Sequence, residues 1–133
     1  MRYEDWNHKR LLLVEDNQLN MEIAEELLKP TGVKLEKARD GKEAVEKVKA
    51  HPSGYYDLVF MDIQMPVMNG YDATKAIRKL EGGAYEELPI VAMSANAFSE
   101  DISKGKSAGM NGYISKPVER DKLIKAIETW CGL

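Results

Sequence analysis

The sequence predicts an α/β fold in which a parallel five-stranded sheet is doubly wound between two layers of helices. Short continuous apolar runs alternate along the chain with longer segments of helical period, which is the pattern of repeated βαβ units. The 133 residues suit one compact domain. A hydrophobic share of 44% and a charged share of 31% indicate a chain that buries a core rather than a disordered one.

Five segments have the composition of strands. Residues 11–14, 58–61 and 90–93 are uninterrupted apolar runs, as expected of central strands covered on both faces. Residues 33–38 alternate between apolar and polar side chains, and residues 112–115 are short and partly polar. Both of these segments are therefore predicted at the sheet edges.

Apolar residues at helical spacing predict a helix after each strand. The stripe of the first helix consists of Leu19, Ile23, Ala24, Leu27 and Leu28. Pro30 and Gly32 should end that helix. Asp40 and Glu43 resemble a capping box that opens the second helix, which buries Ala44, Val45 and Val48.

Three more helices complete the pattern. The third buries a stripe formed by Ala73, Ala76, Ile77 and Leu80. The fourth lies between Ser99 and Ser107 and stops at Gly109. The last buries Leu123, Ile124 and Ile127. With one helix between successive strands, right-handed crossovers produce a parallel sheet with helices on both faces.

Charge and composition exclude several classes of function. Nineteen Lys and Arg against 22 Asp and Glu give a net charge of −3, which offers no basic surface for nucleic acid or an anionic membrane. The single cysteine, Cys131, excludes an internal disulfide and favours a reducing compartment. Without an apolar run long enough for a transmembrane helix, we expect a cytoplasmic location. Residues 1–8 lack periodicity and are interpreted as an N-terminal arm or cloning remnant before a domain at 9–133.

Polar residues follow four of the predicted strands. Glu15 and Asp16 follow the first strand, Asp62 ends the third, Ser94 ends the fourth and Lys116 follows the fifth. Ligands of such sheets bind outside the carboxyl ends of the strands, so these side chains should converge. Each alone has a structural explanation, such as a helix cap or a solvated charge. Their joint placement favours a functional site.

The residue types point to phosphoryl chemistry. Crowded carboxylates resist joint ionisation unless a cation lies among them. Oxygen ligands without a nearby His or Cys favour Mg²⁺ or Mn²⁺, which also bind phosphate oxygens. Asp62 is the expected nucleophile, because an aspartate can carry a phosphoryl group. Lys116 and Ser94 would then donate to the phosphoryl oxygens.

Four motifs resemble the receiver (response regulator) domain of two-component signalling. They are LLLVEDN at 11–17, MDIQMP at 61–66, AMSANA at 92–97 and YISKP at 113–117. The resemblance runs from about Arg10 to Cys131. The longer run MDIQMPVMNG at 61–70 looks most like receivers attached to hybrid sensor histidine kinases. The resemblance implies a flavodoxin-like (βα)5 sandwich with strand order 2-1-3-4-5.

The same resemblance implies roles for the site residues. The phosphohistidine of a sensor kinase or of a histidine phosphotransfer domain would donate its phosphoryl group to Asp62. Asp16 and Asp62 would bind Mg²⁺ directly, Glu15 through water and Gln64 through its backbone carbonyl. Lys116 would precede a cis peptide bond to Pro117.

Switching and lifetime are also implied by the resemblance. Ser94 and Tyr113 would move on phosphorylation, which shifts a pre-existing conformational equilibrium. Gln64 and Asn96 would tune the lifetime of the phosphoaspartate. Ser94 replaces a frequent Thr but keeps the hydroxyl group. Whether the chain forms a weak homodimer through its last helix is left open by the sequence.

Two alternatives remain. A degenerate receiver fold could act as a phosphorylation-independent interaction module. A phosphohydrolase working through an aspartyl phosphate is less favoured, because such enzymes usually carry a second Asp where this chain has Gln64. Dinucleotide binding is excluded, since no Gly-x-Gly-x-x-Gly follows the first strand. The chain is therefore not expected to be a stand-alone enzyme, although it would catalyse its own phosphorylation and dephosphorylation, as a separate receiver or as part of a hybrid histidine kinase.

Overall fold

The computed structural model describes residues 6–95 and 99–133 and has a single parallel sheet in that part of the chain. Its strands are β1 (Arg10–Val14), β2 (Lys34–Ala38), β3 (Leu58–Asp62), β4 (Ile90–Ser94) and β5 (Gly112–Ser115). They lie in the order β2-β1-β3-β4-β5, and every neighbouring pair is parallel. The predicted central and edge strands are confirmed.

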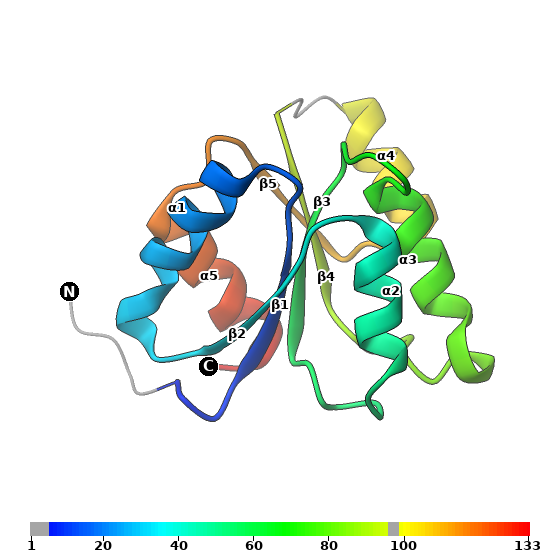
Figure 1. Cartoon of the computed structure of the whole chain (residues 1–133), viewed down its shortest axis with the longest axis horizontal. Coiled ribbons are helices and arrows are strands. Elements are labelled where there is room, and N and C mark those ends of the chain that lie inside the picture. The colour runs from blue at the N-terminus through cyan, green and yellow to red at the C-terminus, as the bar shows by residue number, and fades with distance from the viewer. Residues whose placement is uncertain (1–5, 96–98) are drawn as a thin grey trace.

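Helices cover both faces of the sheet (Figure 1). They are α1 (Gln18–Leu28), α2 (Gly41–Lys49), α3 (Gly70–Lys79), α4 (Ser99–Ala108) and α5 (Arg120–Cys131). Helices α1 and α5 pack on one face, and α2, α3 and α4 pack on the other. The doubly wound three-layer sandwich expected from the sequence is therefore confirmed.

Alternate side chains of each central strand enter one of two apolar cores. In β1, Leu12 and Val14 lie in the core under α2 and α3, whereas Leu11 and Leu13 lie in the core under α1 and α5. Every residue of β3 is buried. Continuous apolar runs are needed here because a strand covered on both faces has no solvent side.

The predicted apolar stripe of α1 is only partly correct. Ala24 and Leu28 are buried as expected, but Leu19 is 64% exposed and Ile23 is 44% exposed. Met21 is buried in their place, at 4% exposure. The helix therefore turns the Met21 side toward the sheet and leaves two large aliphatic side chains in solvent near the carboxyl end of β1.

The two tryptophans of the chain lie in different settings. Trp6, within the predicted arm, is 4% exposed in the core under α1 and α5, and its backbone N–H donates to the carbonyl of Thr31 at 3.1 Å. Residue 6 is thus packed onto the domain rather than detached from it. Trp130, in the last turn of α5, is 37% exposed.

Asx residues cap the first three helices. Asn17, Asp40 and Asn69 each accept a hydrogen bond from the backbone N–H three residues on, at 2.8 to 2.9 Å. The second half of the predicted capping box differs, because the Glu43 carboxylate accepts from the N–H of Arg39. Within the described residues, no helix is long and apolar enough to cross a membrane.

Candidate functional site

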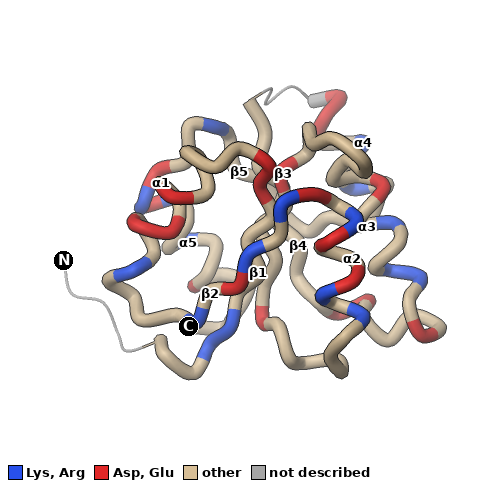
Figure 2. Tube along the Cα trace, viewed as in Figure 1, with Lys and Arg blue, Asp and Glu red and all other residues tan. Residues whose placement is uncertain are grey.

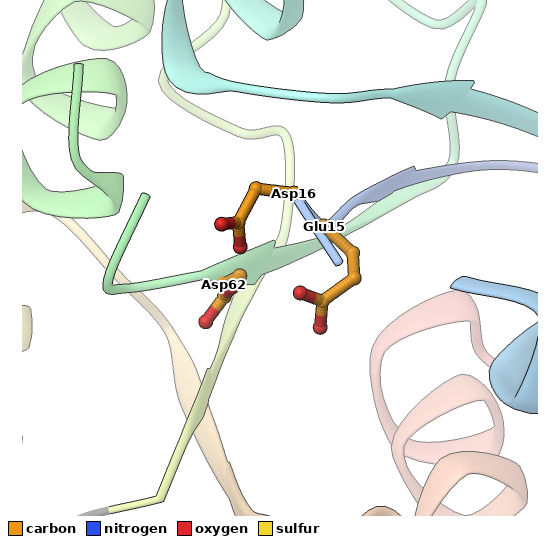
Figure 3. A group of neighbouring side chains, drawn as sticks. All are labelled: Glu15, Asp16 and Asp62. Carbon is orange, nitrogen blue, oxygen red and sulfur yellow. The ribbon is translucent and has the colours of Figure 1, made fainter. Parts of the chain in front are cut away.

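Three carboxylates meet where β1 and β3 end. Glu15 and Asp16 directly follow β1, and Asp62 is the last residue of β3, the adjacent strand. Figure 2 shows acidic residues gathered at this edge, whereas residues of both charges are mixed along α2. Figure 3 shows the three side chains around the end of β3. The sequence prediction that these residues converge agrees with their positions.

The geometry of the cluster suits a hard divalent cation. One oxygen from each carboxylate lies within 4.8 Å of the other two. Glu15 and Asp62 are each 3% exposed, whereas Asp16 is exposed. Buried carboxylates that face each other are costly without a compensating charge. Oxygen donors with one solvent-facing side match Mg²⁺, which keeps water ligands.

Lys116 supplies positive charge on the other side of the cluster. Its ammonium lies 2.8 Å from Glu15 Oε1 and 3.1 Å from Asp62 Oδ1. Lys116 directly follows β5, the strand next to β4, so it lies at the same edge of the sheet as the carboxylates. The Lys116–Pro117 peptide bond is cis, as expected. Burial opposes the charged form, but the hydrogen bond to Glu15 and the charge of Asp62 outweigh it and raise the pKa of Lys116.

Asp62 is electrostatically unusual. Burial and the neighbouring Glu15 raise the pKa of the Asp62 carboxyl to about 7, and this rise exceeds the opposing effect of Lys116. The cause is desolvation first and like charge second. Without a cation, Asp62 is therefore only partly ionised near neutral pH. A bound cation would favour the ionised form.

Gly70 allows the chain to close tightly around Asp62. A β-carbon at Gly70 would overlap the backbone oxygen of Asp62 and would lie 3.0 Å from Cα of Ile63. The Gly70 N–H also donates to the Ile63 carbonyl at 2.8 Å. The first turn of α3 is therefore pressed directly against the end of β3, which fixes the backbone that carries Asp62.

A cleft of about 550 Å³ opens beside Asp16. Of the residues predicted from the sequence, Gln64 and Ser94 line it together with Asp16. Ser94 is 5% exposed, and the side chain of Gln64 is exposed. Gln64 thus lies beside Asp16 at the cleft. Asn96 lies outside the described residues.

Three further residues of the cleft were missed by the sequence analysis. Tyr71 from α3 and Asp101 and Lys104 from α4 line its opposite wall. Tyr71 follows Gly70 at the start of a helix that begins near the carboxyl end of β3. Asp101 and Lys104 are three residues apart, which places them on one face of α4. The position of Tyr71 directly after Gly70 and the three-residue spacing of Asp101 and Lys104 are the sequence features that could have indicated these residues.

Tyr113 does not line this cleft. It lies on β5, partly buried, beside a hollow of about 330 Å³ formed with Ile102 of α4 and Trp130 of α5. The site residues thus divide into a cluster at the carboxyl end of the sheet and a side chain between α4 and α5.

A second groove, of about 310 Å³, borders the cluster on the side of α1. Ile23, Pro117 and Val118 form part of its wall, and Glu15 and Lys116 also line it. The exposed aliphatic side of α1 therefore lies next to the buried charges.

Comparison with known proteins identifies relatives over nearly the whole chain. The family model for the response regulator receiver domain matches residues 11–128. The chain is 44% identical to hybrid signal transduction histidine kinase B of Dictyostelium discoideum over 90% of its own length. It is 41% identical to the osmosensing histidine protein kinase SLN1 of Saccharomyces cerevisiae over 92%. It spans only 6% and 10% of the length of these two relatives.

Solved structures share the fold. The receiver domain of sensor histidine kinase PA1611 from Pseudomonas aeruginosa, with a magnesium ion in its active site cleft, superposes with a TM-score of 0.83 at 37% identity, covering 94% of this chain and 98% of that one. A co-crystal structure of the Saccharomyces cerevisiae histidine phosphotransfer protein Ypd1 with the receiver domain of Ssk1 matches with a TM-score of 0.84 at 33% identity, covering 93% and 89%.

Proposed function

The chain belongs to the response regulator receiver domain family, and from that membership we propose that Asp62 accepts a phosphoryl group from a phosphohistidine. The observation that carries the proposal is the ion-paired cluster of Glu15, Asp62 and Lys116 beside the exposed Asp16. An Asp62 oxygen would attack phosphorus as the phosphorus–nitrogen bond to imidazole breaks. The bonding pair then returns to the imidazole nitrogen.

Each neighbour of Asp62 has a distinct task in this reaction. Lys116, already 3.1 Å from Asp62 Oδ1, would pair with the phosphoryl oxygens once the carboxylate charge is used in the new bond. Ser94 is buried at the end of β4 and would donate its hydroxyl hydrogen to a phosphoryl oxygen. Lys116 already contacts Asp62 before reaction, whereas Ser94 would move toward the phosphoryl group.

The acidic cluster would hold Mg²⁺. Asp16 and Asp62 would be direct carboxylate ligands, Glu15 would act through water, and the Gln64 carbonyl would complete the protein ligands. When bound, Mg²⁺ supplies charge that offsets the carboxylates and the phosphoryl oxygens. Burial of Glu15 and Asp62 supports this assignment, since their mutual repulsion needs more than one ammonium to balance it.

Switching would connect the cleft to the hollow between α4 and α5. Ser94 ends β4, and Tyr113 lies on the adjacent strand β5. Movement of Ser94 toward a phosphoryl group would change the space available to Tyr113 and so favour one of two conformations. Gln64 and Asn96 would set how readily water attacks the phosphoaspartate.

The groove beside α1 is proposed to receive the phosphodonor protein, a sensor kinase or a histidine phosphotransfer protein. Leu19 and Ile23 expose aliphatic surface next to the groove that Glu15 and Lys116 line. We expect Ile23→Asp to slow phosphotransfer from a histidine phosphotransfer protein at least tenfold, which corresponds to about 1.4 kcal/mol of binding. Phosphorylation by acetyl phosphate, which needs no protein contact, should be unchanged. Equal loss with both donors would reject this docking surface.

Intact mass spectrometry tests the central proposal. Incubation with acetyl phosphate and Mg²⁺ should add one phosphoryl group to the wild-type protein and none to Asp62→Asn. Asp72→Asn, which removes an exposed carboxylate of α3, is the matched control and should be modified like the wild type. An adduct that persists in Asp62→Asn would place the phosphoacceptor elsewhere.

The same experiment separates the alternatives. Absence of any adduct on the wild type would favour a phosphorylation-independent interaction module. Rapid hydrolysis of an aryl phosphate in the presence of Mg²⁺ would instead favour a phosphohydrolase. We expect no such turnover, because Gln64 stands where a general acid would be needed.

A further inference from the structure

The residues that line the cleft have an uneven charge distribution. Its charged residues within the described part of the chain are Asp16, Asp101 and Lys104. Lys116, the other cation nearby, is already paired with Glu15 and Asp62. Lys104 is therefore the cation of the cleft wall that no carboxylate of the described residues pairs with at ion-pair distance.

Lys104 is exposed to solvent, but its ammonium contacts an aromatic ring of the cleft wall. Its ammonium lies 4.9 Å from the centre of the Tyr71 ring, which is a cation–π arrangement. Tyr71 is 7% exposed, and its hydroxyl donates to the backbone carbonyl of Asp101 at 3.4 Å. The ring is thus fixed between α3 and α4 and presents one face to the ammonium.

From this geometry we infer that Lys104 is a specificity-determining residue that favours phosphodonors with more negative charge. Tyr71 is the residue that positions Lys104. The inference rests on the proposed function. Without Lys104, every charged side chain that lines the cleft would be acidic, and only a bound cation would offset the repulsion of an anionic donor as it approached Asp62. A fixed cation at the wall raises the local concentration of anions and their rate of association.

Small donors of different charge provide the test. At neutral pH acetyl phosphate carries more negative charge than phosphoramidate. We expect Lys104→Met, which keeps a long apolar side chain, to lower the second-order rate of phosphorylation by acetyl phosphate about fivefold. The loss should be smaller with phosphoramidate and should shrink at high ionic strength, because salt screens exposed charges. The maximal rate at saturating donor should be unchanged.

Two lysine variants serve as controls. Lys104→Arg keeps the charge and should retain the wild-type rate. Lys106→Met removes another exposed cation of α4, two residues away and outside the residues lining the cleft, so it should have no effect. Equal losses in Lys104→Met and Lys106→Met, or a loss in Lys104→Met that ignores donor charge and salt, would overturn the inference.

The role of Tyr71 is tested by coupling. Tyr71→Leu should reduce discrimination between the two donors, and it should add nothing when Lys104 is already Met, because both changes remove the same fixed charge. Additive losses would mean that Tyr71 acts independently of Lys104. If the wild-type protein is not phosphorylated at Asp62 by either donor, the proposed function fails. If Asp62 is phosphorylated normally and Lys104→Met discriminates between the two donors as the wild type does, the inference about Lys104 is rejected while the proposed function stands.

Discussion

At the scale of single residues, Asp62 links the proposed chemistry to stability. Its pKa is raised from an ordinary value of 3.8 to about 7 by burial and by Glu15. The folded protein therefore binds this proton more tightly than the unfolded chain. The stabilising contribution is full below pH 3.8, declines as the pH rises, and is lost above pH 7.

Asp62→Asn should consequently stabilise the metal-free protein more at pH 8 than at pH 5. We expect a gain of about 2 kcal/mol at pH 8, after allowance for the coupling to Lys116, since one pKa unit corresponds to about 1.4 kcal/mol. Urea denaturation in the presence of a chelator measures it. Asp72→Asn controls for the surface change, and a gain in Asp62→Asn that does not depend on pH would contradict the electrostatic explanation.

Site residues could be predicted from the sequence where chain position alone fixes them. Glu15, Asp62 and Ser94 end or follow buried strands, so topology brings them to one edge. Lys104 could not be predicted in the same way, because the direction in which a helical side chain points depends on how α4 packs on Tyr71. Tertiary packing, rather than local pattern, decides such cases.

At the scale of secondary structure elements, the junction between β3 and α3 determines how Asp62 is held. Gly70→Ala should destabilise the protein by about 2 kcal/mol or more, because its β-carbon would overlap backbone atoms that cannot move aside. It should also slow phosphorylation, since the backbone of Asp62 must shift. Thermal unfolding and acetyl phosphate labelling measure the two effects.

Gly105 provides the matched comparison within a helix. A β-carbon there would lie 3.2 Å from the sulfur of Met110, the end of a flexible side chain that can yield. Gly105→Ala should therefore be close to neutral, with the cost of crowding offset by about 1 kcal/mol of helix propensity. Equal destabilisation by both substitutions would show that close backbone contact is not what makes Gly70 necessary.

The strands and helices could be predicted from the sequence, but the long-range contacts that hold their ends could not. The order and type of strands and helices followed from period and length. The predicted face of α1 was only partly correct, because Leu19 and Met21 fit two alternative stripes. Arg78 looks like a solvated residue near a helix end, yet it donates to the carbonyls of Tyr85, Leu88 and Gly109. Such contacts join segments that are distant in sequence.

At the scale of the whole molecule, metal binding should be visible as stability. A ligand that binds only the folded state adds about 2.7 kcal/mol at one hundred times its dissociation constant. We expect the melting temperature to rise with Mg²⁺ concentration at pH 8 and to rise less at pH 6, where more of Asp62 is protonated. Asp16→Asn should lose most of this effect. Equal stabilisation of Asp16→Asn would locate the binding outside the acidic cluster.

The positions of the two tryptophans determine what their fluorescence can report. Trp6 precedes β1, and Trp130 lies against Gly112 at the start of β5, so both indoles lie near the amino ends of strands. Asp62 ends its strand, and five residues of β-structure span about 16 Å. Neither indole can be quenched by direct contact with a group bound at Asp62. Any change in their emission on phosphorylation would therefore report movement relayed across the sheet.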